Sequence, residues 1–413
     1  MELKPRCLEK VVQMVNKGID IPNPLSLDIG AEVNIDQISA KNVTIYPGCR
    51  IYGDKTVISA GAKLGYEGPV TIENCQIGKK VELKGGFFSK SVFLDKSNMG
   101  LGAQVREGCI LEEEAGGAHC VGLKQTILFP FVTLGSLINF CDCLMAGGTS
   151  RRNHSEVGSS YIHFNFTPDG DKTTPSLIGD VPRGVMLNQP PIFLGGQGGM
   201  VGPLRLGYGN VVAAGSILRA DYPEDNMLIV GRTHSGGTRR YVPAAYPNLV
   251  GIVEKNILYL ANLSALEQWY IHVRRPFLEG GEFGTQIYAG LIDKLSLAKK
   301  ERLKRLEAMA ERASNIPEMK EEKGRLRHEL REKVGEIQAL LKASVPEDSI
   351  VKLRDEFMAD LDISQNVGAG YIETIQGLPA AVSAKGIEWL DRIVAFHCRR
   401  ISAAMPALGL FGK

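Results

Sequence analysis

The feature of this sequence that most restricts its fold is a run of aliphatic residues spaced six positions apart, with occasional slips. These aliphatic positions are Ile45, Ile51, Val57, Leu64, Val70, Ile77, Leu83, Leu206, Val212 and Leu218. A period of six matches neither an α-helix, with about 3.6 residues per turn, nor a strand that alternates its two faces. It matches a triangular coil in which each face supplies one short strand and one inward aliphatic residue. The sequence therefore predicts a parallel β-helix of hexapeptide repeats over residues 26–242, in which each coil is stabilised by its neighbours.

The repeat is interrupted in two stretches, at about 87–145 and at about 150–175. The first stretch keeps part of the spacing, and the second loses it. Insertions into a solenoid leave it as loops and often form the binding surface, so both stretches are predicted to be inserted loops. The run GGQGG at 195–199 is a further break. Glycines permit either a loop that crosses a corner or a close approach of the backbone, and both interpretations stay open.

The last part of the chain has the periodicity of amphipathic helices. After about residue 242, apolar residues recur at steps of three and four. The apolar stripes of two charged segments consist of Leu291, Leu295, Leu303, Leu306, Leu326, Leu330, Val334, Ile337 and Leu341. Such stripes are typical of a helical hairpin or of an oligomer interface, and here the core of the domain is the simpler interpretation. We therefore expect an N-terminal helix and linker at 1–25 and an α-helical domain at 243–413.

Charge and composition restrict the partners. Lys and Arg total 48 against 46 for Asp and Glu, so the net charge of +2 gives no electrostatic reason to expect nucleic acid or an anionic membrane as a partner. No signal-peptide pattern is visible, and no window approaches the roughly 18 consecutive apolar residues of a membrane span. The chain has eight cysteines, expected to be buried thiols. Because the close pair Cys141 and Cys143 has no second pair at zinc-site spacing, we expect no metal site. Because the sequence shows no signal-peptide pattern and no membrane span, we expect a cytoplasmic protein.

Side chains suited to binding a ligand are concentrated between Ser150 and Lys172. They are Arg151, Arg152, Asn153, His154, Glu156, His163, Asn165 and Lys172. Taken singly, such residues are ordinary surface groups or turn formers. Because five of them fall within six positions on a loop of a solenoid, this stretch is predicted to bind a ligand.

Two histidines in this stretch are candidates for a general base. Histidine changes its charge near neutral pH, and a positioned base contributes roughly 10²- to 10⁴-fold to a reaction rate. His154 is the first candidate, with Glu156 as the carboxylate that orients it. His163 is the alternative, and alternation along a strand puts it on the same side as Asn165.

The remaining polar residues are predicted to hold the substrate. Arg151 and Arg152 could bind phosphate, because a guanidinium matches phosphate with two parallel hydrogen bonds. Asn165 could donate a hydrogen bond to a carbonyl or hydroxyl oxygen of the substrate. Asn153, His163 and Lys172 complete this predicted substrate-binding set.

Several longer stretches carry a resemblance to a known family. A short helix is followed by GIDIPNPLSLDIGAEVNI and VTIYPGCRIYGDKTVI, and later by SEVGSSYIHFNFTPDGDKTTPSLIGDV and VGPLRLGYGNVVAAGSILRADYPEDNMLIVGR. In this order they resemble the C-terminal acetyltransferase half of the bacterial bifunctional N-acetylglucosamine-1-phosphate uridyltransferase and glucosamine-1-phosphate acetyltransferase. The resemblance covers about residues 8–233 and implies that the β-helix is left-handed.

The resemblance also implies a function. The family transfers an acetyl group from acetyl-CoA to the amine of a hexosamine phosphate, in clefts between the subunits of a trimer. It therefore implies a homotrimer, a sugar phosphate or nucleotide sugar as substrate, and acetyl-CoA or another acyl-CoA as donor. Asn165 matches a sugar-contacting asparagine and Lys172 a lysine of the motif. Ala214 falls in the Ala-Ala-Gly corner beside CoA, and Arg232 falls near the arginine that binds the CoA phosphate.

The chain also departs from the family pattern at positions that matter for chemistry. Counting back from Glu156, the family's catalytic histidine falls on Gly148. Phe129 stands before Pro130, where the family has a sugar-phosphate arginine, and the stretch at 139–143 offers no lysine. The family's Gly-rich uridyl-binding segment has no counterpart before the first helix, so uridyl transfer is not expected.

Two hypotheses follow from these patterns. In the first, the chain is an acyl-CoA-dependent transferase that acts on a sugar phosphate or nucleotide sugar, with His154 as the base. In the second, it is a β-helix that binds a ligand or a protein partner and has lost the chemistry. The dense Arg and His cluster favours the first hypothesis, and the departures at the family's catalytic positions favour the second.

Overall fold

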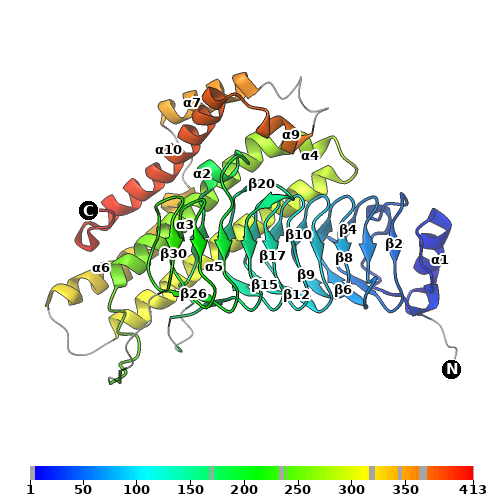
Figure 1. Ribbon diagram of the computed structural model, residues 1–413, viewed down its shortest axis with the longest axis horizontal. Coiled ribbons are helices and arrows are strands. Elements are labelled where there is room, and N and C mark those ends of the chain that lie inside the picture. Colours follow the sequence, from blue (N-terminus) through cyan, green and yellow to red (C-terminus); the bar gives the residue numbers. More distant parts are fainter. Residues whose placement is uncertain are drawn as a thin grey trace.

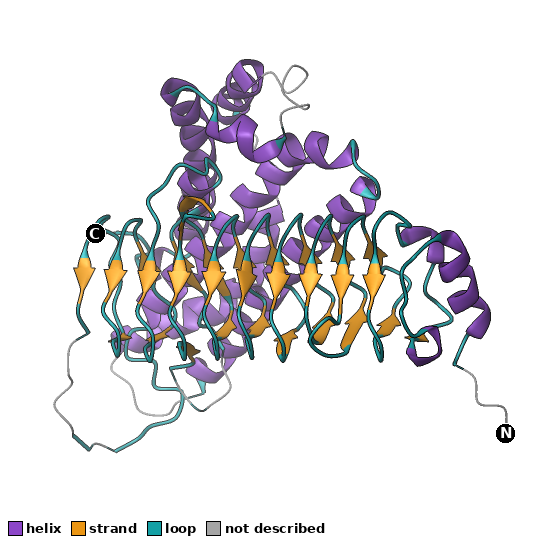
Figure 2. Ribbon diagram, turned by 45° about the vertical axis from the view of Figure 1, so that its right-hand side comes forward, coloured by secondary structure: helices purple, strands orange, loops and turns teal. Residues whose placement is uncertain are grey.

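In the computed structural model, short parallel strands wind into a β-helix, and helices pack along one side of it (Figures 1 and 2). The structure describes residues 5–166, 168, 172–231, 237–238, 240–315, 321–342, 347–361 and 370–412, with side chains from 324 to 341 in the 321–342 segment. The fold class predicted from the sequence, a left-handed β-helix followed by helices, is confirmed.

The β-helix has three faces, here called sheet 1, sheet 2 and sheet 3. Sheet 1 contains β1 (Asp28–Ile29), β3 (Arg50–Tyr52), β6 (Val70–Glu73), β9 (Gly86–Ser89), β12 (Ala103–Val105), β15 (Gly122–Lys124), β18 (Asn139–Cys141), β23 (Ile162–Phe164), β26 (Gly199–Val201) and β29 (Ile217–Leu218). Sheet 2 contains β4 (Val57–Ile58), β7 (Gln76–Ile77), β10 (Val92–Phe93), β13 (Ile110–Leu111), β16 (Ile127–Leu128), β19 (Cys143–Met145), β24 (Ser176–Ile178) and β27 (Arg205–Leu206). Sheet 3 contains β2 (Thr44–Ile45), β5 (Lys63–Leu64), β8 (Glu82–Leu83), β11 (Asn98–Met99), β14 (Gly116–Gly117), β17 (Thr133–Leu134), β22 (Glu156–Val157), β25 (Phe193–Leu194), β28 (Val211–Val212) and β30 (Leu228–Ile229). The chain passes from sheet 1 to sheet 2 to sheet 3 in each coil.

A ladder of apolar side chains fills the interior. On sheet 2 the inward residues pair in register from one coil to the next, in the order Ile58, Ile77, Phe93, Leu111, Leu128, Met145, Ile178 and Leu206. All of them are buried. Each such side chain contributes roughly 1.5–3 kcal/mol when it leaves water, so the repeated inward position is what fixes the coil.

Residues 87–145 were predicted to be an inserted loop, and here the structure differs. They form regular coils from β9 to β19. Leu111 pairs with Leu128, and Leu128 with Met145, so successive partners are 17 positions apart. A coil one residue shorter than three repeats of six shifts the aliphatic spacing without breaking the ladder, which explains why the pattern looked degraded.

Two short helices lie near the start of the chain and within the β-helix, and the other helices lie in the C-terminal part. They are α1 (Leu8–Lys17), α2 (Val181–Gly184), α3 (Leu249–Trp269), the π-helical turn η3 (Tyr270–Arg274), α4 (Arg275–Glu279), α5 (Gly284–Ser314), α6 (Glu321–Lys342), α7 (Asp348–Leu361), α9 (Tyr371–Gln376) and α10 (Ala380–Ala404). Short 3-10 turns are η1 (Pro24–Ser26), η2 (Ile35–Gln37) and η5 (Pro406–Leu408). The leucine stripes predicted from the sequence lie in α5 and α6 and are largely buried in a helical core.

The helical domain and the β-helix share one hydrophobic core. Helix α5 contacts β7 and β10, and α3 contacts β24, so both helices lie against sheet 2. Trp269, Phe357 and Trp389 pack their rings together and link α3, α7 and α10. Sheet 2 is therefore the face that carries the helical domain.

One helical stretch among the described residues, Leu249–Glu279, is long and apolar enough to cross a membrane by length and composition. However, 67% of its most apolar window is buried inside the structure. It packs against α10, α5 and β24. The helix therefore serves as a core helix of this fold.

Candidate functional site

The first part of the polar stretch forms a hairpin at the corner between sheets 2 and 3. After β19 the chain leaves the coil and forms two short antiparallel strands, β20 (Gly148–Ser150) and β21 (Asn153–His154). Gly148 pairs with His154 across this hairpin. Gly148 has a φ of +95°, and a Cβ atom there would lie 2.6 Å from the Cα of His154. No larger residue fits at Gly148, and His154 stands directly opposite it.

His154 has a fixed orientation. Its Nδ1 lies 2.9 Å from the carbonyl oxygen of Arg151, and its Nε2 lies 3.9 Å from Oε2 of Glu156. A carbonyl oxygen only accepts, so in the neutral imidazole Nδ1 carries the proton and Nε2 carries the lone pair. A base at Nε2 beside a carboxylate can take up a proton as an imidazolium stabilised by that carboxylate.

The side chains of Arg151 and Asn153 make contacts within the β-helix and the hairpin. Arg151 Nη1 donates to the carbonyl oxygens of Glu114 and Phe131 and to Oγ1 of Thr133. Arg151 thus anchors the hairpin to two preceding coils. Asn153 Nδ2 donates to Oγ1 of Thr149 at 2.9 Å and stabilises the same turn. Arg151 and Arg152 are both exposed, so Arg151 makes these contacts at the surface.

The second part of the polar stretch lies at another corner, between sheets 1 and 2. His163 is 8% exposed and its Nε2 lies 2.9 Å from Oγ of Ser176. Burial lowers the pKa of His163 to about 4, so its imidazole is neutral at pH 7. Asn165 accepts from Oγ1 of Thr174, and the carbonyl of Lys172 accepts from Arg302 of α5. Within one chain, these residues do not converge with His154.

The two predicted cofactor-binding residues lie elsewhere. Ala214 is exposed at the corner between sheets 3 and 1. The backbone of Ala214 packs against Gly195, where a Cβ atom would collide with it. This close approach of two coils accounts for the glycine at position 195. Arg232 lies outside the described residues.

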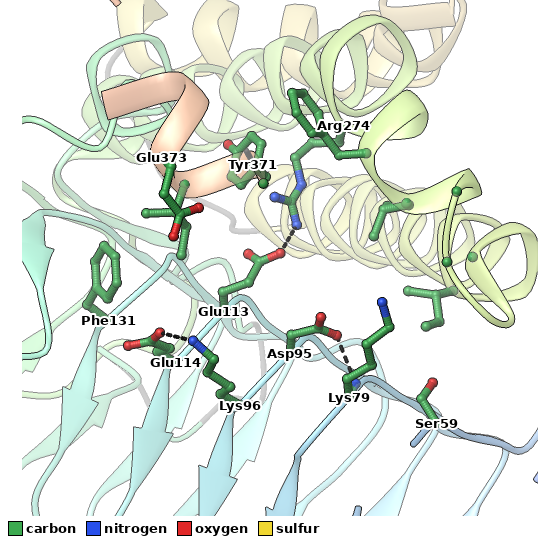
Figure 3. A pocket seen from close by; sticks show the side chains of 18 of the residues that line it. Ser59, Lys79, Asp95, Lys96, Glu113, Glu114, Phe131, Arg274, Tyr371 and Glu373 are labelled. Carbon is green, nitrogen blue, oxygen red and sulfur yellow. Dashed lines mark hydrogen bonds and ion pairs between the residues drawn. The ribbon is translucent and has the colours of Figure 1, made fainter. Parts of the chain in front are cut away.

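A cleft of about 580 Å³ lies beside the hairpin, and no sequence motif pointed to it (Figure 3). One wall consists of the corners between sheets 2 and 3, and the other wall is formed by α4, the start of α5 and α9. The lining residues are Ser59, Lys79, Asp95, Lys96, Glu113, Glu114, Phe131, Thr149, Ser150, Arg151, Arg274, Phe277, Leu278, Gly280, Gly281, Glu282, Gly284, Ile287, Gly370, Tyr371, Ile372, Glu373 and Gln376. Lys79, Asp95 and Glu113 each lie two positions after an inward residue of sheet 2, namely Ile77, Phe93 and Leu111, which are paired in register.

A buried network joins the two walls of the cleft. The hydroxyl of Tyr270 donates to Oε1 of Glu112 at 2.5 Å, and Nη2 of Arg274 donates to Oε1 of Glu113 at 2.5 Å. The guanidinium of Arg274 lies 3.7 Å from the centre of the Tyr371 ring. Burial raises the pKa of Glu112 to about 7, although Arg274 opposes this effect. The π-helical turn η3 supplies both Tyr270 and Arg274, and such turns are frequent at functional sites.

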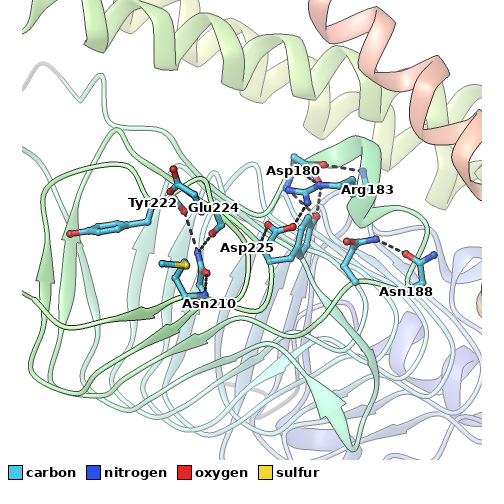
Figure 4. Close-up of polar contacts among 10 residues, drawn as sticks. Asp180, Arg183, Asn188, Asn210, Tyr222, Glu224 and Asp225 are labelled. Atoms are coloured by element: carbon cyan, nitrogen blue, oxygen red, sulfur yellow. Dashed lines mark hydrogen bonds and ion pairs between the residues drawn. The ribbon is translucent and has the colours of Figure 1, made fainter.

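A second polar cluster closes the last coils of the β-helix (Figure 4). Nε of Arg183 lies 2.7 Å from Oδ2 of Asp180, and its Nη1 lies 2.6 Å from Oδ2 of Asp225. Asn210 Nδ2 donates to the carbonyl oxygens of Tyr222 and Glu224. The ion pairs of Arg183 and the hydrogen bonds from Asn210 to backbone carbonyls both help to hold the final coils together. Within the described ranges, no group of three metal-ligating side chains comes together here or elsewhere.

Comparison with known proteins gives several relatives named bifunctional protein GlmU. The chain is 27% identical over 217 residues to the bifunctional protein GlmU of Thermotoga maritima, which covers 52% of this chain and 43% of the relative. It is 29% identical over 233 residues to GlmU of Fervidobacterium nodosum, with 55% and 44% covered. GlmU of Carboxydothermus hydrogenoformans is 25% identical over 233 residues, with 56% and 46% covered. About half of this chain is similar to GlmU proteins.

The match and the fold agree in extent. The matched length of 217 residues is close to that of the β-helix, and a GlmU-like β-helix fits the strands observed here. The chain spans less than half the length of each of these GlmU relatives. No family model matches the chain.

Proposed function

We propose that the GlmU-like half of this chain transfers an acyl group from acetyl-CoA or another acyl-CoA to a sugar phosphate or nucleotide sugar. The observation that carries this proposal is the pairing of His154 with Gly148. Gly148 is where the resemblance puts the catalytic histidine, and the hairpin presents His154 directly across from that position. His154 is thus the candidate base, and Glu156 is the residue that would stabilise its charged form.

The chemistry would centre on Nε2 of His154. This atom would take the proton of the acceptor amine or hydroxyl as the acceptor atom bonds to the thioester carbonyl carbon. When the carbon–sulfur bond breaks, the imidazolium would return the proton to the sulfur. Acyl-CoA would supply only the activated acyl group. A general base of this kind contributes roughly 10²- to 10⁴-fold to the rate.

The proposal includes a homotrimer, supported by exposed apolar residues on the outer face of sheet 3. Phe193, Val211 and Leu228 follow one another in register on three successive coils. Their exposed fractions are 38%, 43% and 71%. Sheet 2 is covered by the chain's own helices, so subunit contacts would use this apolar stripe. In a trimer, Asn165, Lys172, Ala214 and Arg232 of one subunit could approach the hairpin of another.

A cytoplasmic location is also proposed. All eight cysteines are free thiols, as is usual in a reducing compartment.

The experiment is a paired measurement of binding and turnover. The purified protein should bind acetyl-CoA in calorimetry and acylate a sugar phosphate or nucleotide sugar from an acceptor panel. His154→Gln should lower turnover about 10²- to 10⁴-fold while the melting temperature stays the same. The control is His119→Gln, because His119 is an exposed histidine at a different corner. Absence of acyl-CoA binding at millimolar concentration would overturn the proposal.

A second function is favoured by one observation. Arg151, a predicted phosphate ligand, is engaged with backbone oxygens of the β-helix, and the other predicted substrate residues are divided between corners. This division favours a β-helix that binds a sugar phosphate or nucleotide sugar without transferring a group. Binding of such a ligand with no turnover on any acceptor would select this function over the first.

A further inference from the structure

One guanidinium group fastens the hairpin to the corners of two preceding coils. Glu114 and Phe131 occupy equivalent places on successive coils, and both have a positive φ. Nη1 of Arg151 lies 3.0 Å and 3.4 Å from their carbonyl oxygens and 2.8 Å from Oγ1 of Thr133. Because all three contacts come from a single nitrogen, Arg151 acts here as a point donor and not as a two-pronged fork.

The backbone of the same residue holds the imidazole of His154. The carbonyl oxygen of Arg151 lies 2.9 Å from Nδ1, whereas Oε2 of Glu156 lies 3.9 Å from Nε2. The two acceptors compete, because the neutral ring carries one proton and each acceptor attracts it to the nitrogen that it faces. The carbonyl is within hydrogen-bond distance, and the carboxylate is farther away, 48% exposed and screened by water. The proton is therefore held at Nδ1, and Nε2 keeps its lone pair.

Other contacts shape the turn of the hairpin. Oγ of Ser150 accepts from the backbone N–H groups of Arg152 and Asn153, and strands β20 and β21 pair with each other. These contacts do not involve the carbonyl oxygen of Arg151. The hairpin can thus form without the guanidinium contacts, but the carbonyl that faces the imidazole would then lose its fixed position.

We propose that Arg151 is a positioning residue for His154, because its guanidinium anchors the peptide carbonyl that selects the tautomer with a lone pair on Nε2. Without this anchor, the carboxylate of Glu156 would draw the proton to Nε2, and the ring would present a donor where a base is needed. The effect on turnover rests on the proposed acyl transfer, whereas the tautomer does not depend on it. The inference gives Arg151 a role other than that of a phosphate ligand.

The test reads the tautomer directly by nitrogen-15 NMR of protein labelled at histidine. Spectra are recorded without substrate at about pH 8, where an ordinary imidazole is neutral, and His154→Gln assigns the signals. In the wild-type protein we expect Nε2 of His154 to be unprotonated. Arg151→Gln should move the tautomer ratio about tenfold towards a proton on Nε2. A tenfold change corresponds to about 1.4 kcal/mol, which is within the range of one net hydrogen bond.

Three further variants separate position from charge and from folding. Arg151→Lys should restore most of the wild-type ratio, because an ammonium group also offers its N–H groups from one nitrogen. Arg152→Gln removes the same charge from the next position, whose guanidinium takes no part in these contacts, and should leave the ratio unchanged. Thr133→Val removes one acceptor and should give a smaller shift in the same direction. It keeps the test decisive if the melting temperature shows that Arg151→Gln folds poorly.

Turnover and affinity separate positioning from phosphate binding. Arg151→Gln should lower turnover about tenfold, in line with the tautomer ratio, and should leave the affinity for glucosamine 1-phosphate in calorimetry unchanged. A wild-type ring protonated at Nε2, or an unchanged ratio in folded Arg151→Gln, would overturn the inference. Weaker binding with an unchanged ratio would make Arg151 a phosphate ligand instead. The NMR ratio decides the role of Arg151 even if the wild-type protein shows no turnover, so failure of acyl transfer and failure of this inference are distinguishable.

Discussion

Two corners of the same β-helix, separated by less than twenty residues, have opposite surroundings. The hairpin corner, Gly148–His154, leaves the coil and holds His154 by local contacts. The covered corner, between β23 and β24, lies under α3 and α5, where Asn256 Nδ2 donates to the carbonyl oxygen of Thr173. The histidine at the covered corner, His163, is buried and neutral, whereas His154 has a lone pair beside a carboxylate.

The difference teaches which polar residues are available for chemistry. At the covered corner, polar groups form hydrogen bonds and ion pairs that join the helical domain to the β-helix. At the hairpin corner, the helical domain makes a lighter contact, through Gln376 of α9. A histidine in a polar sequence cluster is therefore informative about function only when its corner is known.

The largest effect is expected where the covered corner meets α5. Nη2 of Arg302 lies 2.7 Å from Oδ1 of Asp142, and both side chains are at least nine-tenths buried. Arg302→Met leaves a buried carboxylate without its partner and should lower the free energy of unfolding by about 3–5 kcal/mol. Chemical denaturation measures this loss. Adding Asp142→Asn should restore most of it, and Arg305→Met, at a half-buried pair with Glu301, should cost under about 1 kcal/mol. Equal losses in Arg302→Met and Arg305→Met would refute the buried pair.

The next effect concerns Glu112, which is buried next to the cleft residue Glu113. Its pKa is raised from 4.5 to about 7, so between these values the folded protein holds a proton that the unfolded chain has lost. Stability from this group is present at low pH and is lost as the pH rises towards 7. Glu112→Gln keeps an acceptor for Tyr270 and does not titrate. Its stability relative to wild type should therefore rise by on the order of 2–3 kcal/mol from about pH 5 to pH 8.

Thermal unfolding at several pH values measures this difference. Glu114→Gln is the matched control, because the carboxylate of Glu114 is ion-paired with Lys96 near the surface. Glu114→Gln should change the free energy of unfolding by less than about 1 kcal/mol at every pH. A Glu112→Gln effect that does not change with pH would contradict a buried proton on Glu112.

His163 should give the opposite pH dependence. Its pKa is lowered from 6.5 to about 4, so the unfolded chain binds a proton in this range that the folded protein does not. Stability from the neutral imidazole is complete above pH 6.5 and is lost as the pH falls to 4. His163→Gln should be less stable than wild type at pH 7. Near pH 4.5 its free energy of unfolding relative to wild type should be higher than at pH 7 by on the order of 2 kcal/mol. The same melting series measures this, and unchanged turnover at pH 7 would separate His163 from His154.

The smallest effect is expected at the contact between α9 and the hairpin corner. Nε2 of Gln376 donates to the carbonyl oxygens of Thr149 at 2.7 Å and of Leu187 at 2.9 Å. Gln376→Ala should cost about 1 kcal/mol and should speed amide hydrogen exchange in the hairpin. Gln189→Ala, at a half-buried glutamine whose side chain bonds to Asn188, is the control and should leave the hairpin unchanged. Unaltered exchange in Gln376→Ala would mean that the hairpin is rigid without α9.

Much of the fold could be predicted because its information is periodic. Inward residues such as Ile77 and Leu206 recur at the same place in each coil, and the stripe from Leu330 to Leu341 recurs on one helix face. The error at 87–145 arose because coils of 17 residues keep the ladder but shift the spacing. Periodic burial is a local property, so a pattern finds it where the period is constant and loses it where the coil length changes.

The candidate site could be predicted only in part. The sequence identified His154 and Glu156 as neighbours, and the structure brings them within 3.9 Å. The sequence could not show that His154 and His163 have different surroundings. The strand and corner between them determine that His154 lies at the hairpin and that His163 is buried. The cleft was missed entirely, since Lys79 and Arg274 are nearly two hundred positions apart.

By itself, the sequence determined that this chain is a β-helix with a helical partner, because each inward aliphatic residue must leave water at its own turn of the coil. The tertiary structure alone decided where the polar groups lie. It paired His154 with Gly148, buried His163 under α3 and α5, and set the N-terminus of α5 beside Lys79. The last two of these arrangements depend on how distant segments pack against sheet 2, and no local period encodes that packing.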